Sequence, residues 1–159
     1  MGNSALEAKQ REREQVDGFT RSEAHKAVWA EKRVAKEQEE RYNKAVTDAR
    51  EQMAQMPLQI NRGNQNKHDP TRKSYIEGRS VFYGTVEDAQ ALVDRYHGME
   101  EIRLDKNLKW IKKEFVNAND IIGKVYSNDT GVFVETNRFA IHYGKSGTHI
   151  VPRKPERKD

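Results

Sequence analysis

Two histidines, a tyrosine, a threonine and a lysine are gathered in one short stretch, FAIHYGKSGTHIVPRK, at residues 139–154. Imidazole is the side chain that both accepts and donates a proton near neutral pH. Metal-independent cleavage of RNA needs a base for the 2′-hydroxyl, an acid for the departing 5′-oxygen, and cations that stabilise the phosphorane. His142, His149, Lys145 and Arg153 supply these types of group.

The spacing within this stretch predicts a β-hairpin, because apolar and polar residues alternate around a GKSG turn at 144–147. If the chain turns at Lys145 and Ser146, His142 and His149 lie opposite one another on one face, with Cβ atoms about 5 Å apart. A bulge at Gly147 would break this pairing. The other face is expected to carry Phe139, Ile141, Tyr143, Thr148 and Ile150.

A third imidazole lies in a loop-rich segment, INRGNQNKHDPTRKSY, at residues 60–75. Gly, Pro and Asn indicate turns here, and hydrogen-bond donors are dense. His68 is therefore a candidate to replace either hairpin histidine. The donors of this segment are Arg62, Gln65, Asn66, Lys67, Arg72 and Lys73.

Three other interpretations of these residues stay open. In the first, the hairpin histidines are solvated or hydrogen-bonded on an ordinary surface. In the second they bind zinc, but no third ligand of the usual spacing is present. The third is a DNA-cutting metal nuclease, whose carboxylates form no recognisable metal cluster: Asp69, Glu87, Asp88 and Glu114. No metal and no cofactor is therefore expected.

The composition favours a small core and a long solvated segment, since 35% of the 159 residues are hydrophobic and 34% are charged. There is no cysteine, which excludes disulfides and thiolate metal sites. Residues 1–57 have balanced charges, so the whole excess of +4 lies in the rest of the chain. A basic compact domain favours nucleic acid as its partner. The sequence contains no apolar run of about 18 residues, so no membrane span is expected. The polar N-terminus does not have the pattern of a signal peptide.

Periodicity predicts an α+β protein. Helices are expected at 4–16 and 20–56, the second capped by Thr20 with Glu23 and carrying a thin apolar stripe through Val28 and Tyr42. A further helix begins after Thr85 and ends at Gly98. Short strands are expected near 79–83 and at 109–117, 120–126, 132–136, 139–143 and 148–151, as an antiparallel meander with the one main helix packed on it.

Several motifs, in order, resemble those of the polymorphic toxin type 50 domain, which occurs at the C-terminus of bacterial polymorphic toxins and of some phage head-associated proteins. They are INRGNQNKH at 60–68, GRS at 78–80, EDAQALVDRYHG at 87–98, W-x-K-K-E at 110–114, IIGKV at 121–125 and IHYGKSGTHIVP at 141–152. The resemblance covers about residues 58–153. It implies a ribonuclease of the barnase–colicin–RelE type of fold. The shared polar positions are Asn61, Gly63, Gln65, His68, Arg79, His142, Tyr143, Lys145, Thr148 and His149.

This sequence departs from the family pattern HYSKNGTHIVP at the turn, where Gly144 and Ser146 replace Ser and Asn. Any role of a serine at position 144 is therefore in doubt. With the resemblance, the expected organisation is a helical arm at 1–57, a toxin domain at 58–153 and a basic tail at 154–159. The candidate catalytic residues are His142, His149, His68, Lys145, Thr148 and Tyr143; the candidate substrate-binding residues are Arg79, Lys67, Asn61, Gln65 and Arg153.

The expected function is a metal-independent endoribonuclease toxin that leaves a 2′,3′-cyclic phosphate and a 5′-hydroxyl. RNA and a small acidic immunity protein are the expected partners, and the site of action is the bacterial cytoplasm, with virion association or delivery from a neighbouring cell as routes to it. The rival interpretation is a non-catalytic module that binds nucleic acid or a partner while the arm docks on a phage head or toxin delivery assembly.

Overall fold

The computed structural model describes residues 18–155 and divides into two compact units, Met1–Lys44 and Ala45–Asp159. Helix α2 (Gly18–Ala54) runs through the boundary between them. The helix expected at 20–56 is therefore present, whereas the one expected at 4–16 lies outside the described residues. Thr20 does not begin α2, because Gly18 and Phe19 are already helical. The domain limits drawn at residues 57 and 153 stay predictions.

In the first unit, the part of α2 with described side chains is exposed. Val28 and Tyr42 of its apolar stripe are 47% and 49% exposed, and Trp29 beside Val28 is 57% exposed. No helix in the described part of the chain is long and apolar enough to cross a membrane.

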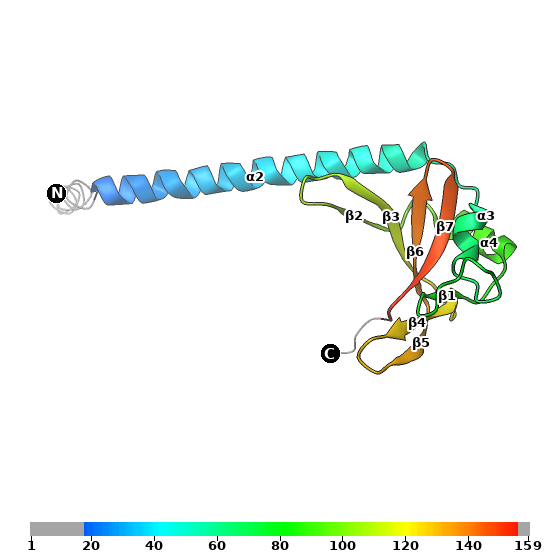
Figure 1. The fold of residues 1–159 in the computed structure, drawn as a ribbon. Coiled ribbons are helices and arrows are strands. Elements are labelled where there is room, and N and C mark those ends of the chain that lie inside the picture. Colours follow the sequence, from blue (N-terminus) through cyan, green and yellow to red (C-terminus); the bar gives the residue numbers. More distant parts are fainter. Residues whose placement is uncertain (1–17, 156–159) are drawn as a thin grey trace, which may run out of the picture. The chain divides into compact units, whose positions relative to one another are not determined.

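The second unit contains two antiparallel sheets and a main helix (Figure 1), which confirms the α+β fold. The four-stranded sheet has the order β2-β3-β6-β7, and the three-stranded sheet has the order β1-β4-β5. The helices and strands of the second unit that follow α2 are, in chain order, α3 (Arg62–Asn66), β1 (Val81–Phe82), α4 (Val86–Tyr96), β2 (Glu101–Leu104), β3 (Trp110–Asn117), β4 (Gly123–Ser127), β5 (Val132–Thr136), β6 (Arg138–Gly144) and β7 (Gly147–Arg153).

The expectation of one meander is wrong, because β3 pairs with β6 and not with β4. After β3 the chain leaves this sheet, and β4 pairs with β1 and β5 in the second one. Gly123 permits this, since a Cβ there would lie 2.1 Å from the carbonyl oxygen of Val81. Strand β2 was also not expected from the sequence. Its four residues follow the helix closely and pair with β3.

Helix α4 begins and ends as the sequence predicts. Thr85 and Asp88 form a reciprocal capping box, and Gly98 has a φ of 97° just after the helix. Its Ala89 and Val93 are fully buried against the inner side of the four-stranded sheet. The largest fully buried side chains of this core are Phe139, Ile141 and Ile150 from the sheet, each with no exposed surface.

A buried polar network joins the end of α2 to the sheet. The carboxylate of Glu114 on β3 accepts hydrogen bonds from the Tyr143 hydroxyl at 2.6 Å and from the backbone N–H groups of Gly98 and Glu100 at 3.0 and 2.8 Å. Arg50 on α2 lies 3.8 Å from the same carboxylate and donates to the carbonyls of Gly98 and Glu100. These contacts satisfy a fully buried charge.

Candidate functional site: a histidine cluster on the sheet

The β6–β7 hairpin has the predicted register, with His142 paired to His149 and Gly144 paired to Gly147. The two imidazole centroids are 4.8 Å apart. Gly147 has a φ of 123°, and a Cβ there would lie 2.4 Å from the carbonyl oxygen of Gln59. Only glycine at position 147 therefore allows the turn to pack against the backbone of Gln59.

His68 completes a cluster of three imidazoles. It follows α3, and its ring stacks on that of His149 with centroids 5.8 Å apart and planes inclined by 21°. The Nδ1 atom of His68 lies 2.9 Å from the carbonyl oxygen of Ser80, which can only accept a hydrogen bond. The Ser80 hydroxyl oxygen also lies 3.1 Å from Nδ1. A hydrogen bond to the carbonyl requires the proton on Nδ1, and in this tautomer Nε2 of the neutral ring keeps its lone pair.

The surroundings of the cluster lower the pKa values of all three imidazoles, which favours their neutral forms near pH 7. Burial, with the charges of His149 and Lys113, lowers the pKa of His142 to about 3. Burial, with the charges of His68 and Lys67, lowers the pKa of His149 to about 4. Burial also lowers the pKa of His68, against the opposing effect of its hydrogen bond to Ser80. Neutral imidazoles are ready to accept protons, and a bound anion would raise their pKa values.

Three cations act on the cluster. Lys67 and Arg79, both predicted to bind substrate, lower the pKa of His68 by charge repulsion. The third, Lys113 on β3, is directly opposite His142 across the β3–β6 pair. Sequence reasoning did not select it, and only the pairing of β3 with β6 reveals its place. Lys145 occupies the exposed turn between β6 and β7.

Tyr143 and Thr148 lie on the opposite face of the hairpin from the histidines. Tyr143 is 6% exposed and donates its hydroxyl hydrogen to Glu114, while Thr148 has no exposed surface and donates to the carbonyl of Leu58 at 3.1 Å. Both belong to the core, because adjacent residues of a strand point to opposite faces. Through these contacts, Tyr143 and Thr148 support the hairpin from the face opposite the histidines.

Asn61 and Gln65 attach α3 to the hairpin. Asn61 caps α3 by accepting from the N–H of Asn64, and it donates to the Ser146 hydroxyl at 3.1 Å. The buried amide of Gln65 donates to the Ile150 carbonyl at 3.1 Å and accepts from the Ile150 N–H at 2.6 Å. Both residues were predicted to bind substrate. Their contacts show how they hold the α3 segment, and with it His68, against β7.

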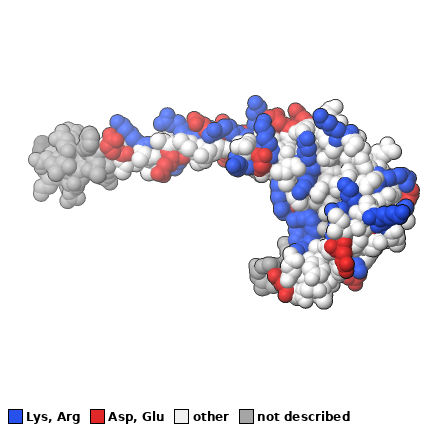
Figure 2. All heavy atoms as spheres, in the orientation of Figure 1, with Lys and Arg blue, Asp and Glu red and all other residues white. Residues whose placement is uncertain are grey.

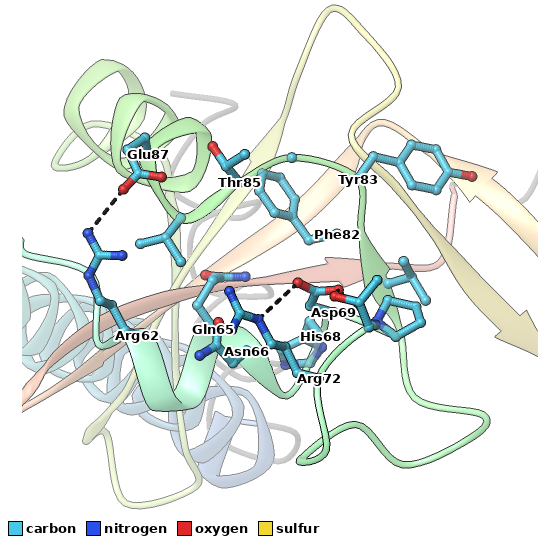
Figure 3. A pocket seen from close by; sticks show the side chains of 15 residues that line it. Arg62, Gln65, Asn66, His68, Asp69, Arg72, Phe82, Tyr83, Thr85 and Glu87 are labelled. Carbon is cyan, nitrogen blue, oxygen red and sulfur yellow. Dashed lines mark hydrogen bonds and ion pairs between the residues drawn. The ribbon is translucent and has the colours of Figure 1, made fainter.

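A cavity of about 480 Å³ adjoins the cluster at His68. Ion pairs join Arg62 to Glu87 at 3.0 Å and Arg72 to Asp69 at 3.6 Å, and Figure 3 shows both as dashed lines. The remaining lining comes from α3 and the segment after it, from β1 and the residues that join it to α4, and from the start of α4. Its members with larger side chains include Gln65, Asn66, Pro70, Phe82, Tyr83 and Val86.

Within residues 18–155 no group of three or more His, Cys, Asp or Glu side chains is arranged to hold a metal ion. The carboxylates weighed for a metal nuclease have other partners. Asp69 accepts from Thr71, Asp88 caps α4, Glu87 pairs with Arg62, and Glu114 is enclosed in the core. The arrangement of the site rests on imidazoles and cations.

A histidine cluster on a basic antiparallel sheet, set beside a helix, is compatible with a toxin of nuclease-like function. The family model described as Bacterial toxin 50 matches residues 60–152, and the chain belongs to that family. The match contains all three clustered histidines and confirms the resemblance found in the sequence motifs. A toxin family of this kind generally implies an immunity protein as a partner. No curated protein matches the chain.

Proposed function

We propose that the second unit is an endoribonuclease that cleaves RNA by imidazole acid–base catalysis without a metal. The observation that carries this proposal is the cluster of His68, His142 and His149, with adjacent ring centroids 5.8 and 4.8 Å apart. These distances allow two imidazoles to serve the two oxygens of a single phosphodiester. Family membership supports a toxic activity of this kind.

In the proposed reaction, one neutral imidazole removes the proton of the 2′-hydroxyl as O2′ forms its bond to phosphorus. The bond between phosphorus and O5′ breaks, and a protonated imidazole gives its proton to the departing oxygen. The products are a 2′,3′-cyclic phosphate and a 5′-hydroxyl. His142 and His149 form the proposed pair, and His68 is the substitute for either of them.

The low pKa values of the cluster make this reaction depend on the substrate. The acid must be protonated, yet burial holds His142 and His149 neutral near pH 7 in the free protein. A phosphodiester anion bound between the rings favours the charged form of an imidazole and raises its pKa. Lys113, Arg79 and Lys67 then stabilise the extra negative charge of the phosphorane.

The test is an incubation of purified protein with RNA in EDTA, comparing wild type with His149→Ala. Discrete fragments that end in a cyclic phosphate, and that disappear in the variant, are expected. His25→Ala is the matched control, because His25 is an exposed histidine on α2, bonded to Trp29. Activity that appears only after a metal is added would refute the imidazole mechanism.

Intact RNA in every lane, with RNA binding retained, would instead favour a non-catalytic binding module. In that case single substitutions of His142 or His149 would change binding only slightly. The acid–base proposal expects the opposite pattern, a loss of about 10²–10⁴ in rate with binding preserved.

The proposed partners follow from charge. An acidic immunity protein would cover the basic face of the sheet and so exclude RNA from the histidines. We also propose that the domain acts in the bacterial cytoplasm and that α2 connects it to a delivery or phage head assembly. Co-expression of an acidic protein that is encoded next to the toxin gene should restore growth to cells that produce the toxin.

A further inference from the structure

The face of the sheet that carries the histidines continues well beyond them. Alternate residues of a strand share a face, so residues two and four positions from the histidines lie on the same side. The register sets out three rows across β3, β6 and β7. The rows are Lys113–His142–His149, then Phe115–Ala140–Val151, then Asn117–Arg138–Arg153.

Arginines of β2 and of the far row gather beside the aromatic ring of the middle row. The guanidinium carbons of Arg103 and Arg153 lie 4.1 and 4.2 Å from the centroid of Phe115. Arg138 is the direct cross-strand partner of Arg153 and donates to Asn117 at 2.9 Å. Figure 2 shows Lys and Arg side chains gathered over β2, β3 and the end of β7.

This cluster is short of negative charge. Among the described residues, Glu101 on the edge strand β2 is the carboxylate that acts on it, and Glu101 lies 3.3 Å from Arg103. Burial, then the charges of Arg138 and Arg103, lowers the pKa of Arg153, and the charge of Glu101 opposes this lowering. Like charges directly opposite each other in a sheet are destabilising. The fold therefore maintains a repulsive arrangement that a bound anion would relieve.

One donor in the cluster has no partner. The Nη1 atom of Arg153 is buried and makes no hydrogen bond within the described part of the chain. A buried donor without an acceptor costs free energy, and guanidinium groups match the oxygens of phosphates. An anion with several oxygens would accept a hydrogen bond from Arg153. Its negative charge would also offset the repulsion between Arg153 and Arg138.

We propose that Arg103, Arg138 and Arg153 form a phosphate subsite that holds the RNA strand at a distance from the histidine cluster. This inference rests on the proposed ribonuclease function and extends it to the path of the substrate. Arg138 is four residues from His142 along β6, about 13 Å at the rise of a strand. A ligand that reaches both places must carry more than one phosphate, as a polynucleotide strand does.

The test compares two substrates that differ in length. A dinucleoside monophosphate carries only the scissile phosphate, whereas a longer single-stranded oligoribonucleotide also reaches the subsite. Arg138→Gln and Arg153→Gln should change kcat/KM for the short substrate much less than kcat/KM for the long one. For the long substrate, kcat/KM should fall about tenfold. The control is Arg95→Gln, which removes one exposed arginine of α4 in the same unit.

A binding measurement separates this subsite from the cleavage proposal. In the His149→Ala background, each arginine substitution should weaken binding of the long strand and reduce the slope of log Kd against log salt by about 0.7. Retained affinity and slope in both folded variants would overturn the subsite, even if cleavage is established. Loss of immunity-protein binding alone, with RNA binding intact, would also overturn it. Failure of both substrates to be cleaved refutes the ribonuclease and leaves the binding result to decide the subsite.

Discussion

His68 and His149 stack with their ring centroids 5.8 Å apart, although one follows α3 and the other lies on β7. The contact depends on the bonds of Gln65 to the main chain of Ile150, which fix α3 against the strand. The candidate site is thus built from two segments far apart in the sequence, and each holds the other in place.

If His68 replaces one of the hairpin histidines as acid or base, its replacement by alanine should lower the rate of RNA cleavage by about a hundredfold, within the range for acid–base groups. The reason is that its Nε2 lone pair faces no described partner while Nδ1 donates to Ser80. Single-turnover cleavage measures the effect. A rate equal to that of wild type in a folded His68→Ala protein would restrict the chemistry to the hairpin pair.

Acid should destabilise the protein through the imidazoles. The pKa of His142 is about 3 when folded, against 6.5 for the ordinary side chain, so the unfolded chain binds more protons between these values. The contribution of neutral His142 to the free energy of unfolding is therefore fully present above about pH 6.5 and is lost as the pH falls toward 3. The loss is on the order of 1–2 kcal/mol after allowance for solvent screening. Urea unfolding at several pH values should show a shallower fall for His142→Asn. Parallel curves for the two proteins would contradict this origin.

Lys113 should act on His142 through charge. Lys113→Gln removes a cation that lowers the pKa of His142, so that pKa should rise in the variant. Cleavage should become roughly tenfold slower or more, because a cation facing the phosphorane is lost. NMR titration of the His142 ring protons measures the pKa. Lys109→Gln, an exposed lysine just before β3, should change neither quantity.

Tyr143→Phe should affect stability more than activity. The substitution removes the 2.6 Å hydrogen bond to the buried carboxylate of Glu114, which costs about 1–3 kcal/mol. The free energy of unfolding from urea titration should fall by this amount, while the cleavage rate at full folding stays near that of wild type. A stable variant with a greatly reduced rate would return Tyr143 to the catalytic group.

The hairpin could be predicted because its determinants are local. A two-residue turn between Gly144 and Gly147 fixes the register, and the alternation of residues then places both histidines on one face. The same alternation places Tyr143 and Thr148 on the other face. Their polarity, which the family pattern associates with the site, is accounted for by the contacts with Glu114 and Leu58.

The remainder of the site depends on pairings between distant segments. Lys113 reaches His142 because β3 skips β4 and β5 to pair with β6, and no short-range pattern specifies that choice. The position of His68 likewise follows from the docking of α3 through Gln65. The placement of Arg103 and Arg153 over Phe115, with Arg138 beside Arg153, needs four strands in register. Sequence reasoning selected His68 and Arg153 for their chemistry, but it did not select Lys113, Arg103 or Arg138, whose places depend on these pairings.

The last part of α2 has a consequence for how such toxins can be recombined. Ala49 and Met53 are 3% and 4% exposed in the core of the second unit, and Arg50 serves the Glu114 network. The family match begins only at residue 60. A gene fusion joined at that point would therefore separate the toxin from part of its own core. A junction ahead of Ala45 would transfer an intact folding unit to a new carrier.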